Sequence, residues 1–188
     1  MRAILLKARH MPDQLLHQMR RTEATLGILR IDVPRTVMFL CHGNVCRSPF
    51  AASYFARTAA LSVMAAIRTT SAGFVGPERQ PPREALEAAR RYDIELSNHR
   101  SALVTVQDVH ESDLIIVMSA AQARAIRSRM PDHSSKVFIL GDLDPLRIEK
   151  RTILDPWNGD AARFDESYTR IARCTDALVQ VAVRTHAF

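Results

Sequence analysis

The apolar residues of this chain fall into short runs that alternate with segments of helical composition. Four runs have the length and β-branched or apolar content of strands, at residues 35–40, 66–71, 113–118 and 136–140. Segments of helical composition lie between them, at residues 48–56, 82–92 and 120–130. Strands that alternate with helices predict a parallel sheet covered on both faces. We therefore expect an α/β doubly wound, Rossmann-like domain of three layers with a central four-stranded parallel sheet.

The last predicted helix has the clearest periodicity. Its apolar positions recur at spacings of three and four, which traces one buried face through Phe164, Tyr168, Ile171, Thr175, Leu178 and Ala182. In doubly wound sheets, ligands bind beyond the carboxyl ends of the strands. The turn after the first strand is therefore the first place to expect a functional site.

An N-terminal stretch precedes this alternating pattern. Pro34 separates the two, because proline interrupts a helix that arrives from the N-terminal side. Before it, four apolar residues fit one helical face, namely Leu15, Met19, Leu26 and Leu29. Pro12 suits the start of that helix. The sequence thus predicts a basic, partly helical extension at residues 1–32 and a single domain at residues 33–188.

Composition and charge exclude several classes of protein. The net charge is +6, but residues 1–35 hold seven Lys and Arg against three Asp and Glu, so most of the excess belongs to the extension. Aromatic residues make up 6% of the chain and form no basic, aromatic stripe, so nucleic acid is not an expected partner. Apolar runs are too short for a membrane span or a secretory leader. Three cysteines indicate a reducing, cytoplasmic compartment rather than a disulfide framework.

The turn after the first strand reads Cys-His-Gly-Asn-Val-Cys-Arg-Ser-Pro, residues 41–49. It stands where a strand meets a helix, so free N–H groups and the helix dipole favour an anion there. Gly43 and Asn44 tolerate left-handed backbone angles, which lets successive N–H groups turn inward. The same field favours a thiolate at Cys41, and the planar fork of Arg47 suits two oxygens of a tetrahedral oxyanion. Each residue alone has an ordinary structural explanation, but together they indicate an oxyanion cradle.

With this loop the sequence resembles the low-molecular-weight protein tyrosine phosphatases. The resemblance runs from about residue 37 to residue 178 and rests on the segments at 37–49, 71–73 and 113–118, and on Asp155-Pro-Trp157. It implies the phosphotyrosine protein phosphatase I type of fold and hydrolysis of phosphotyrosine, or a related phosphomonoester, through a cysteinyl-phosphate. A phosphorylated protein is then the expected substrate. It implies no cofactor, and the sequence has no ligand cluster with zinc-like spacing.

The resemblance also assigns roles to individual residues. Cys41 is the expected nucleophile, Arg47 the residue that binds the phosphoryl oxygens, and Asp155 the general acid that later activates water. The rest of the phosphate-binding loop is His42, Gly43, Asn44, Val45, Cys46 and Ser48. Ser71 and His99 match positions that support the loop.

Two Asp-Pro pairs compete for the acid role. Asp155-Pro156 is followed by Trp157, which could wall a phenyl ring, and we assign the acid to Asp155. Asp144-Pro145 is interpreted as a turn, the usual meaning of Asp-Pro. Phe74 is expected to form a second, shorter apolar wall.

Three features remain open at this point. His42 could tune substrate choice or simply line the rim of the pocket. Cys46 could be a small packed side chain, or could form a reversible disulfide with Cys41 that protects the nucleophile from overoxidation. Residues 1–32 could pack on the domain, join a second subunit to form a homodimer, or contact an acidic partner; a thin apolar face disfavours membrane contact.

Rival functions differ in the residues they require. A thioredoxin-coupled arsenate reductase needs further cysteines near residues 98–130, and the chain has none between Cys46 and Cys174. A catalytically idle phosphate-binding protein is disfavoured by the presence of all three expected catalytic residues. A phosphoarginine phosphatase is associated with a small threonine beside the nucleophile, where this chain has His42.

Overall fold

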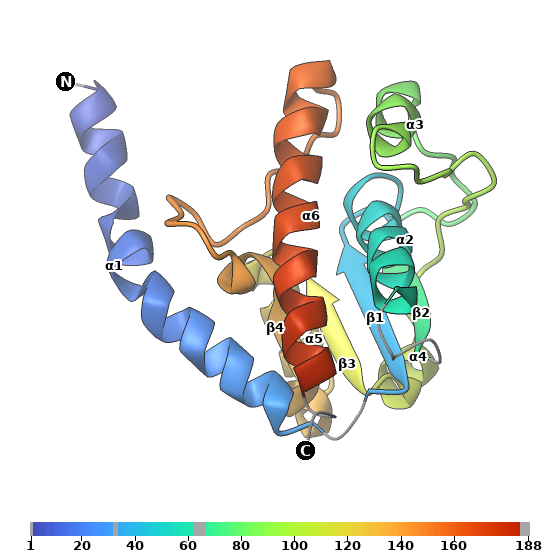
Figure 1. Cartoon of the computed structure of the whole chain (residues 1–188), viewed down its shortest axis with the longest axis horizontal. Coiled ribbons are helices and arrows are strands. Elements are labelled where there is room, and N and C mark those ends of the chain that lie inside the picture. Colours follow the sequence, from blue (N-terminus) through green and yellow to red (C-terminus); the bar gives the residue numbers. More distant parts are fainter. Residues whose placement is uncertain (1, 32–33, 62–66, 185–188) are drawn as a thin grey trace.

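Four parallel strands form the centre of the protein, in the order β2-β1-β3-β4 (Figure 1). The computed structural model describes residues 2–31, 34–61 and 67–184. The strands are β1 (Thr36–Cys41), β2 (Arg68–Gly73), β3 (Leu114–Val117) and β4 (Val137–Ile139). All four predicted strands are confirmed, with ends displaced by one or two residues; Ala66, predicted in the second strand, lies outside the described residues.

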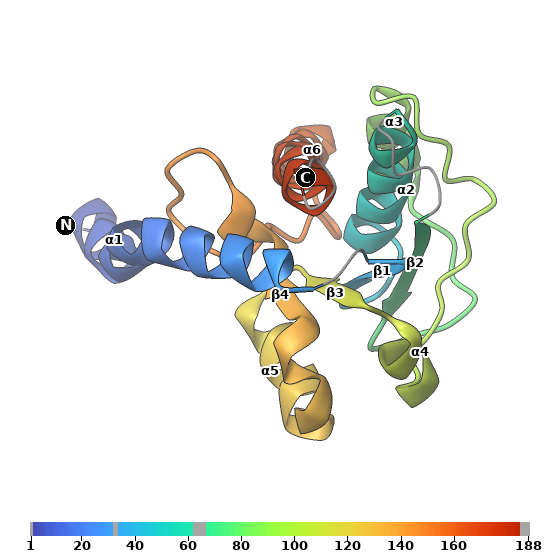
Figure 2. The same cartoon turned by 60° about the horizontal axis from the view of Figure 1, so that its bottom comes forward.

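Helices cover both faces of this sheet, as predicted (Figure 2). One face carries α2 (Arg47–Ala60), α3 (Arg83–Arg90) and α6 (Ala161–Arg184). The other carries α4 (Val106–Glu111) and α5 (Ala120–Arg129). Three short helices were not predicted: α4 and the 3₁₀ helices η1 (Pro131–Lys136) and η2 (Leu140–Leu143). They are too short to show a periodicity, although Thr105 and Asp108 form a capping box at the start of α4.

The alternation of side chains along β1 divides the core into two layers. Phe39 points into the cluster beneath α2 and α6, whereas Met38 and Leu40 point into the cluster beneath α4 and α5. On the first side, the rings of Phe50 in α2 and Tyr168 in α6 stack with centroids 4.0 Å apart. This stacking fixes α2, and with it the loop that precedes α2, against the longest helix of the domain.

The strand order places the end of β1 at the point where the direction of strand addition reverses. From β1 the chain moves outward to β2, then returns to lay β3 on the other side of β1. Crevices that bind ligands form at such switch points, outside the carboxyl ends of the strands. Cys41 is the last residue of β1, so the predicted cradle occupies this crevice.

The N-terminal helix α1 (Arg2–Leu29) is longer than the sequence indicated. Pro12 lies inside it, so the prediction that Pro12 starts the helix is wrong. An internal proline removes one backbone hydrogen bond and bends a helix without necessarily ending it. Figure 1 shows a change of direction part-way along α1.

The second half of α1 packs on the domain through one side of the helix. His17, Ala24 and Ile28 are buried, and the His17 ring nitrogen Nε2 lies 2.9 Å from the backbone oxygen of Asp144. The apolar face predicted from Leu15, Met19, Leu26 and Leu29 lies instead on the exposed side of the helix. Periodicity located the stripe but could not say which side of α1 the domain covers.

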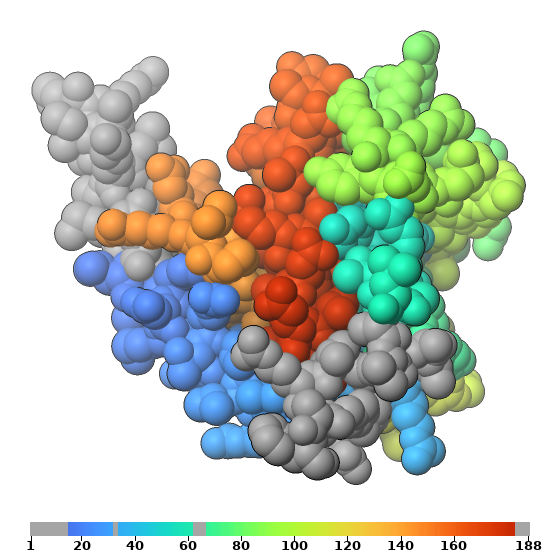
Figure 3. All heavy atoms as spheres, in the orientation of Figure 1, coloured from blue at the N-terminus to red at the C-terminus, as the bar shows by residue number. Residues whose placement is uncertain are grey.

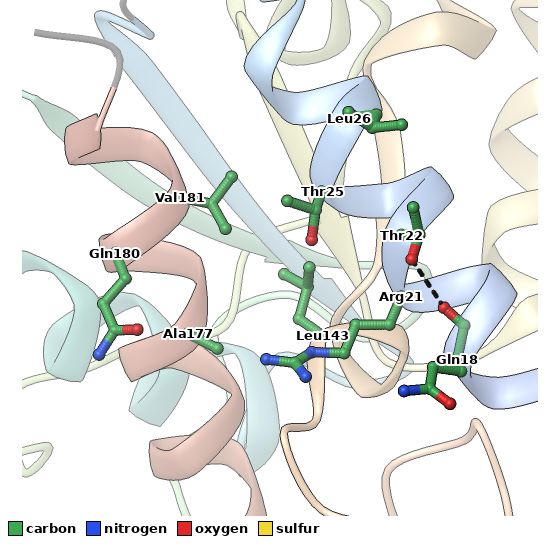
Figure 4. A pocket seen from close by; sticks show the side chains of 9 residues that line it. All are labelled: Gln18, Arg21, Thr22, Thr25, Leu26, Leu143, Ala177, Gln180 and Val181. Carbon is green, nitrogen blue, oxygen red and sulfur yellow. Dashed lines mark hydrogen bonds between the residues drawn. The ribbon is translucent and has the colours of Figure 1, made fainter.

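A pocket of about 380 Å³ separates α1 from α6 (Figure 4). Its walls are polar and apolar side chains of the two helices, with Leu143 of η2 between them. Figure 3 shows α6 running between the α1 side and the α2–α3 side of the molecule. This pocket contains no cysteine, histidine or acidic residue, so it has no group suited to nucleophilic or acid–base chemistry.

Asp144 is fully buried and anchors the segment that leads back to the site. It accepts hydrogen bonds from Arg170 and Arg173 of α6 at 2.8–3.0 Å. Burial by itself raises the pKa of Asp144, but the bonds from Arg173 and the Leu146 backbone N–H, with the two guanidinium charges, lower it overall. Because the folded-state pKa is lowered, this cluster stabilises the fold at neutral pH, and the contribution disappears as pH falls below about 3.8.

Among the described helices, none has a stretch both long and apolar enough to cross a membrane. Within the same residues, no group of three or more histidine, cysteine or acidic side chains is arranged to hold a metal ion.

Candidate active site

The Cys41 sulfur lies at the centre of the loop between β1 and α2. Its Sγ accepts a hydrogen bond from the backbone N–H of Asn44 at 3.2 Å and from the Ser48 hydroxyl at 3.1 Å. Both donors belong to the loop itself, and Cys41 is almost fully buried at the carboxyl end of the sheet. Two hydrogen-bond donors are therefore aimed at one sulfur.

Asn44 holds the loop in shape. Its φ of +52° is left-handed, a conformation that asparagine tolerates better than most residues. Its side-chain nitrogen donates to the hydroxyls of Ser48 and Ser71 at 2.9 Å each, and its side-chain oxygen accepts from the Ala102 N–H at 2.8 Å. The His99 ring donates to the Asn44 backbone oxygen at 2.8 Å. The structure thus brings both predicted supporting residues, Ser71 and His99, onto the loop.

Gly43 does not have the left-handed angle that the sequence suggested, since only Asn44 in this loop has a positive φ. Glycine is needed there for another reason. A Cβ at residue 43 would lie 2.8 Å from Nη2 of Arg79, which donates to the Gly43 carbonyl. The missing side chain therefore makes room for a guanidinium behind the loop.

Arg47 is the first residue of α2, and its guanidinium points into the pocket. It forms an ion pair with Asp155 through Nη2 and donates to the backbone oxygen of Ile153 through Nη1 at 3.4 Å. Its Nε is buried and has no hydrogen-bond partner in the described part of the chain. A buried donor without an acceptor is costly, and an oxyanion in the loop would supply the acceptor.

Asp155 lies across the pocket from the cysteine loop and is about half exposed, with 46% of its side chain accessible. Its second carboxylate oxygen accepts the Trp157 backbone N–H at 3.3 Å, and its backbone oxygen accepts from Arg163 Nε at 3.2 Å. The two Asp-Pro candidates are therefore well separated in role. Asp155 shares a pocket with Cys41, whereas Asp144 is buried between arginines of α6.

The pocket over Cys41 has a volume of about 270 Å³. Its lining combines the loop with two side walls: Cys41, His42, Gly43, Val45, Cys46, Arg47, Val75, Arg79, Asp155 and Trp157. The Trp157 ring is 47% exposed and lines the same side as Asp155, as the sequence predicted. Phe74 does not line the pocket: it packs against the core cluster beneath α4 and α5, and Val75 takes the predicted position in the wall.

The second cysteine of the loop is buried beside the first. Cys46 precedes α2, and both Cys41 and Cys46 are free thiols. Burial raises the pKa of Cys46, and the neighbouring Cys41 and Asp155 raise it further, against smaller opposite effects of Arg47 and Arg79. Cys46 therefore stays a protonated thiol at neutral pH. The disulfide between Cys41 and Cys46 stays a prediction.

Sequence reasoning missed two residues of this pocket, Val75 and Arg79. Both lie in the irregular segment between β2 and α3, where neither periodicity nor a motif marks them. It also missed Tyr168 as a support: its hydroxyl donates to the Cys46 backbone oxygen at 3.0 Å. The helical spacing of Tyr168 indicated only a core residue. The one signal of a supporting role was the residue type, since a tyrosine side chain carries a hydroxyl that can reach a backbone oxygen.

Taken together, these contacts form a site for transfer of a group with a tetrahedral oxyanion. The Cys41 sulfur accepts hydrogen bonds from the Asn44 N–H and the Ser48 hydroxyl, and the Arg47 guanidinium and the Asp155 carboxyl group line the same pocket. Such a site can accept a phosphoryl group on sulfur and deliver a proton to the departing oxygen.

Comparison with known proteins agrees with this chemistry. The family model described as low molecular weight phosphotyrosine protein phosphatase matches residues 36–186. A probable low molecular weight protein-tyrosine-phosphatase, EpsP of Ralstonia solanacearum, is 32% identical over 145 residues, which cover 77% of this chain and 94% of EpsP.

Solved structures show the same architecture. The low molecular weight protein tyrosine phosphatase of T. tengcongensis is 26% identical with a TM-score of 0.68, covering 77% of this chain and 97% of that one. The YwlE arginine phosphatase of Geobacillus stearothermophilus, at 22% identity and a TM-score of 0.69, shares the fold over 78% of this chain and 92% of its own. From the match over most of its length and from the cysteine loop that the structure forms, the chain belongs to the low molecular weight phosphotyrosine protein phosphatases, a family of hydrolases.

Proposed function

We propose that this protein hydrolyses phosphotyrosine in protein substrates through a cysteinyl-phosphate intermediate. The observation that carries the proposal is the meeting of Cys41, Arg47 and Asp155 in one pocket of about 270 Å³. Phosphate monoesters are among the slowest compounds to hydrolyse without a catalyst, so positioning and charge stabilisation must supply most of the acceleration.

In the first step, the substrate phosphoryl group binds in the loop and takes the fork of Arg47. Asp155, which otherwise pairs with that guanidinium, then faces the leaving oxygen. The Cys41 sulfur attacks phosphorus, the bond from phosphorus to the tyrosine oxygen breaks, and protonated Asp155 donates its proton to that oxygen. Loop N–H groups and Arg47 stabilise the charge on the equatorial oxygens.

In the second step, water replaces the sulfur. Asp155, now a carboxylate, accepts a proton from a water molecule that attacks phosphorus. The sulfur–phosphorus bond breaks, orthophosphate leaves, and the thiolate of Cys41 returns to its hydrogen bonds from Asn44 and Ser48. No oxidant, metal or cofactor takes part in either step.

The walls of the pocket favour an aromatic ester. The exposed Trp157 ring and Val75 both line the pocket and can contact a phenyl ring there. Burying such a ring stabilises the bound substrate by about 1.5–3 kcal/mol relative to leaving it exposed. Phosphoserine, an alkyl ester, and phosphoarginine, a phosphoramidate, have no aromatic ring to make this contact.

Side-by-side assays of one peptide carrying phosphotyrosine, phosphoserine or phosphoarginine test the substrate class. We expect kcat/KM for the phosphotyrosine peptide to exceed the other two by about 10- to 100-fold, the free energy of ring burial expressed as a rate. Trp157→Ala should remove most of that preference. A phosphoarginine peptide that reacts faster would reassign the substrate, and absence of any turnover would favour the idle phosphate-binding function.

The compartment and the division of the chain are further parts of the proposal. We assign the protein to the cytoplasm, where a thiolate nucleophile and two other free cysteines stay reduced. Residues 1–32 form an extension outside the matched family region, and residues 33–188 form the phosphatase domain. Neither nucleic acid nor a membrane is a partner in this proposal.

The extension is proposed to pair two copies of the chain into a homodimer. Its exposed residues Leu15, Met19, Leu26 and Leu29 follow, with Thr22, alternating spacings of four and three. This is the repeat of a coiled-coil seam, which is covered by another helix with the same repeat. A second α1 supplies such a helix.

Analytical ultracentrifugation over a range of concentrations tests this pairing. The parent protein should sediment as a dimer, whereas Met19→Glu with Leu26→Glu should be monomeric, because two charges would be buried in the seam. Leu61→Glu, at an apolar residue 85% exposed elsewhere, is the control and should stay dimeric. A parent protein that is monomeric at every concentration would remove the homodimer from the proposal.

A further inference from the structure

Arg79 lines the pocket over Cys41, and its guanidinium is held between Gly43 and Gly76. Its Nε donates to the Gly76 carbonyl at 2.9 Å, and its Nη2 donates to the carbonyls of Val75 at 2.9 Å and Gly43 at 2.8 Å. A Cβ at either Gly43 or Gly76 would clash with the guanidinium. The backbone of Arg79 is anchored too, because its N–H donates to Ser101 Oγ at 2.9 Å and its carbonyl accepts the Ser101 N–H at 2.9 Å.

The bond to Gly43 acts on one particular peptide group. The carbonyl of the Gly43–Asn44 peptide points outward to Arg79, and the N–H of the same peptide points inward to the Cys41 sulfur, 3.2 Å away. A peptide group is planar, so fixing its oxygen on one side fixes its N–H on the other. A cation on the oxygen also polarises the group and strengthens the hydrogen bond that its N–H donates.

Other charged or titratable groups line the same pocket as the sulfur. Arg47 and Asp155 form an ion pair, and His42 and Cys46 belong to the loop itself. Arg47 is paired with Asp155 and, in the proposed reaction, with the phosphoryl group. Arg79, in contrast, has no carboxylate partner among the described residues and makes its bonds to backbone oxygens alone.

We propose that Arg79 is a positioning residue for the nucleophile, which holds the Gly43–Asn44 peptide with its N–H on the Cys41 sulfur and so favours the reactive thiolate. The inference rests on the proposed role of Cys41. It has Arg79 act through the Gly43–Asn44 peptide rather than through the phosphoryl group, and it explains why residue 43 is a glycine. At residue 76 the left-handed φ of +61° favours glycine independently.

The reactivity of Cys41 towards iodoacetamide, a neutral reagent, measures this effect without any substrate. Alkylation is followed from pH 4 to pH 9 and located by mass spectrometry, which separates Cys41 from the protonated, buried Cys46. In Arg79→Met, the pH of half-maximal alkylation should rise by about one unit, the effect of a nearby opposite charge. Arg79→Lys keeps the charge without the fork and should show a smaller rise.

Steady-state kinetics on para-nitrophenyl phosphate give the second readout. In Arg79→Met, the acidic limb of the kcat/KM profile should move to higher pH. At the acidic end of the profile, kcat/KM should therefore be lowered by about tenfold. Arg83→Met is the control, since Arg83 is an exposed arginine four residues away that forms an ion pair with Glu87. It should leave both profiles unchanged.

The outcomes separate this inference from the proposed function. An unchanged alkylation profile in both Arg79 variants would overturn the inference. If KM rose in these variants at the same time, Arg79 would contact the substrate instead. If only the melting temperature fell, the role of Arg79 would be purely structural. If Cys41 of the parent protein is not the cysteine alkylated at low pH, the proposed function is wrong in its choice of nucleophile, and the inference about Arg79 falls with it. Should Arg79→Met not fold, the lysine variant decides alone.

Discussion

Replacement of Cys41 by serine should abolish turnover of aryl phosphates while the protein still binds phosphate or vanadate. A serine hydroxyl is a far weaker nucleophile than a thiolate, and this site favours an anion through hydrogen bonds rather than through a general base beside the nucleophile. We expect kcat to fall by at least about 10³-fold, the order of loss seen when a covalent nucleophile is removed.

Binding should survive because the cradle does not depend on sulfur. The loop is held by Asn44, whose contacts to Ser71, Ala102 and His99 do not involve Cys41. Isothermal titration with orthophosphate or vanadate should therefore give an affinity within about tenfold of the parent protein, since one weak contact changes. Bound phosphate or vanadate should also raise the melting temperature of the serine variant, by mass action.

Cys174→Ser is the matched control. It makes the same atomic change at a fully buried cysteine of α6, outside the pocket. Burying a hydroxyl there should lower the melting temperature, with turnover by the folded protein unchanged. If Cys41→Ser keeps more than a few per cent of parental activity, or if Cys174→Ser loses it, Cys41 is not the nucleophile.

The cysteine loop could be predicted from the sequence because its function is local. Within nine consecutive residues stand the nucleophile, the turn and the guanidinium, and a strand and a helix define where the loop must lie. The supporting residues Ser71, His99 and Asp155 are distant in sequence, and only resemblance to a known family could place them. The structure brings all three to the loop or its pocket.

Contacts made by irregular segments were beyond prediction. Phe74 was expected in the pocket wall, but directly after β2 it packs against the core cluster beneath α4 and α5, and Val75 lines the pocket instead. Arg79 resembled any other surface arginine. Its three backbone acceptors exist only after the segment between β2 and α3 has folded against the loop.

The N-terminal helix shows a different limit. A helical repeat of apolar residues predicts that one face of the helix is buried, but it does not identify the element that packs against that face. In α1 the domain covers the side that carries His17, Ala24 and Ile28. The stronger apolar stripe stays exposed. Patterns within one segment therefore identify faces, whereas assignment of each face to a neighbour requires the tertiary structure.

Replacement of Asp155 by asparagine should lower kcat for phosphotyrosine and phenyl phosphate by about 10²–10⁴-fold, the usual contribution of a positioned general acid. The amide keeps the shape of the carboxyl group but has no proton to give. The loss should be smaller for para-nitrophenyl phosphate, because its phenolate is stable enough to leave without a proton. The alkaline limb of the kcat profile, which reports loss of the acid's proton, should disappear.

The variant also removes the ion pair with Arg47, which gives a second, opposite expectation. In the parent protein a phosphoryl group must displace Asp155 from that guanidinium, whereas asparagine competes only as a neutral acceptor. Orthophosphate should therefore bind Asp155→Asn at least as tightly as the parent protein, while turnover falls. A purely disruptive substitution would weaken both.

Asp160→Asn is the better control for this experiment than the other Asp-Pro pair. Asp144 is fully buried between Arg170 and Arg173, so its loss would cost about 3 kcal/mol of folding free energy and confuse the comparison. Asp160 is exposed, lies five residues after Asp155 and caps the start of α6 through the Arg163 N–H. Its replacement should leave the leaving-group dependence and the alkaline limb intact. Equal losses in both variants, or a loss in Asp155→Asn that is the same for good and poor leaving groups, would mean that Asp155 shapes the pocket without transferring a proton.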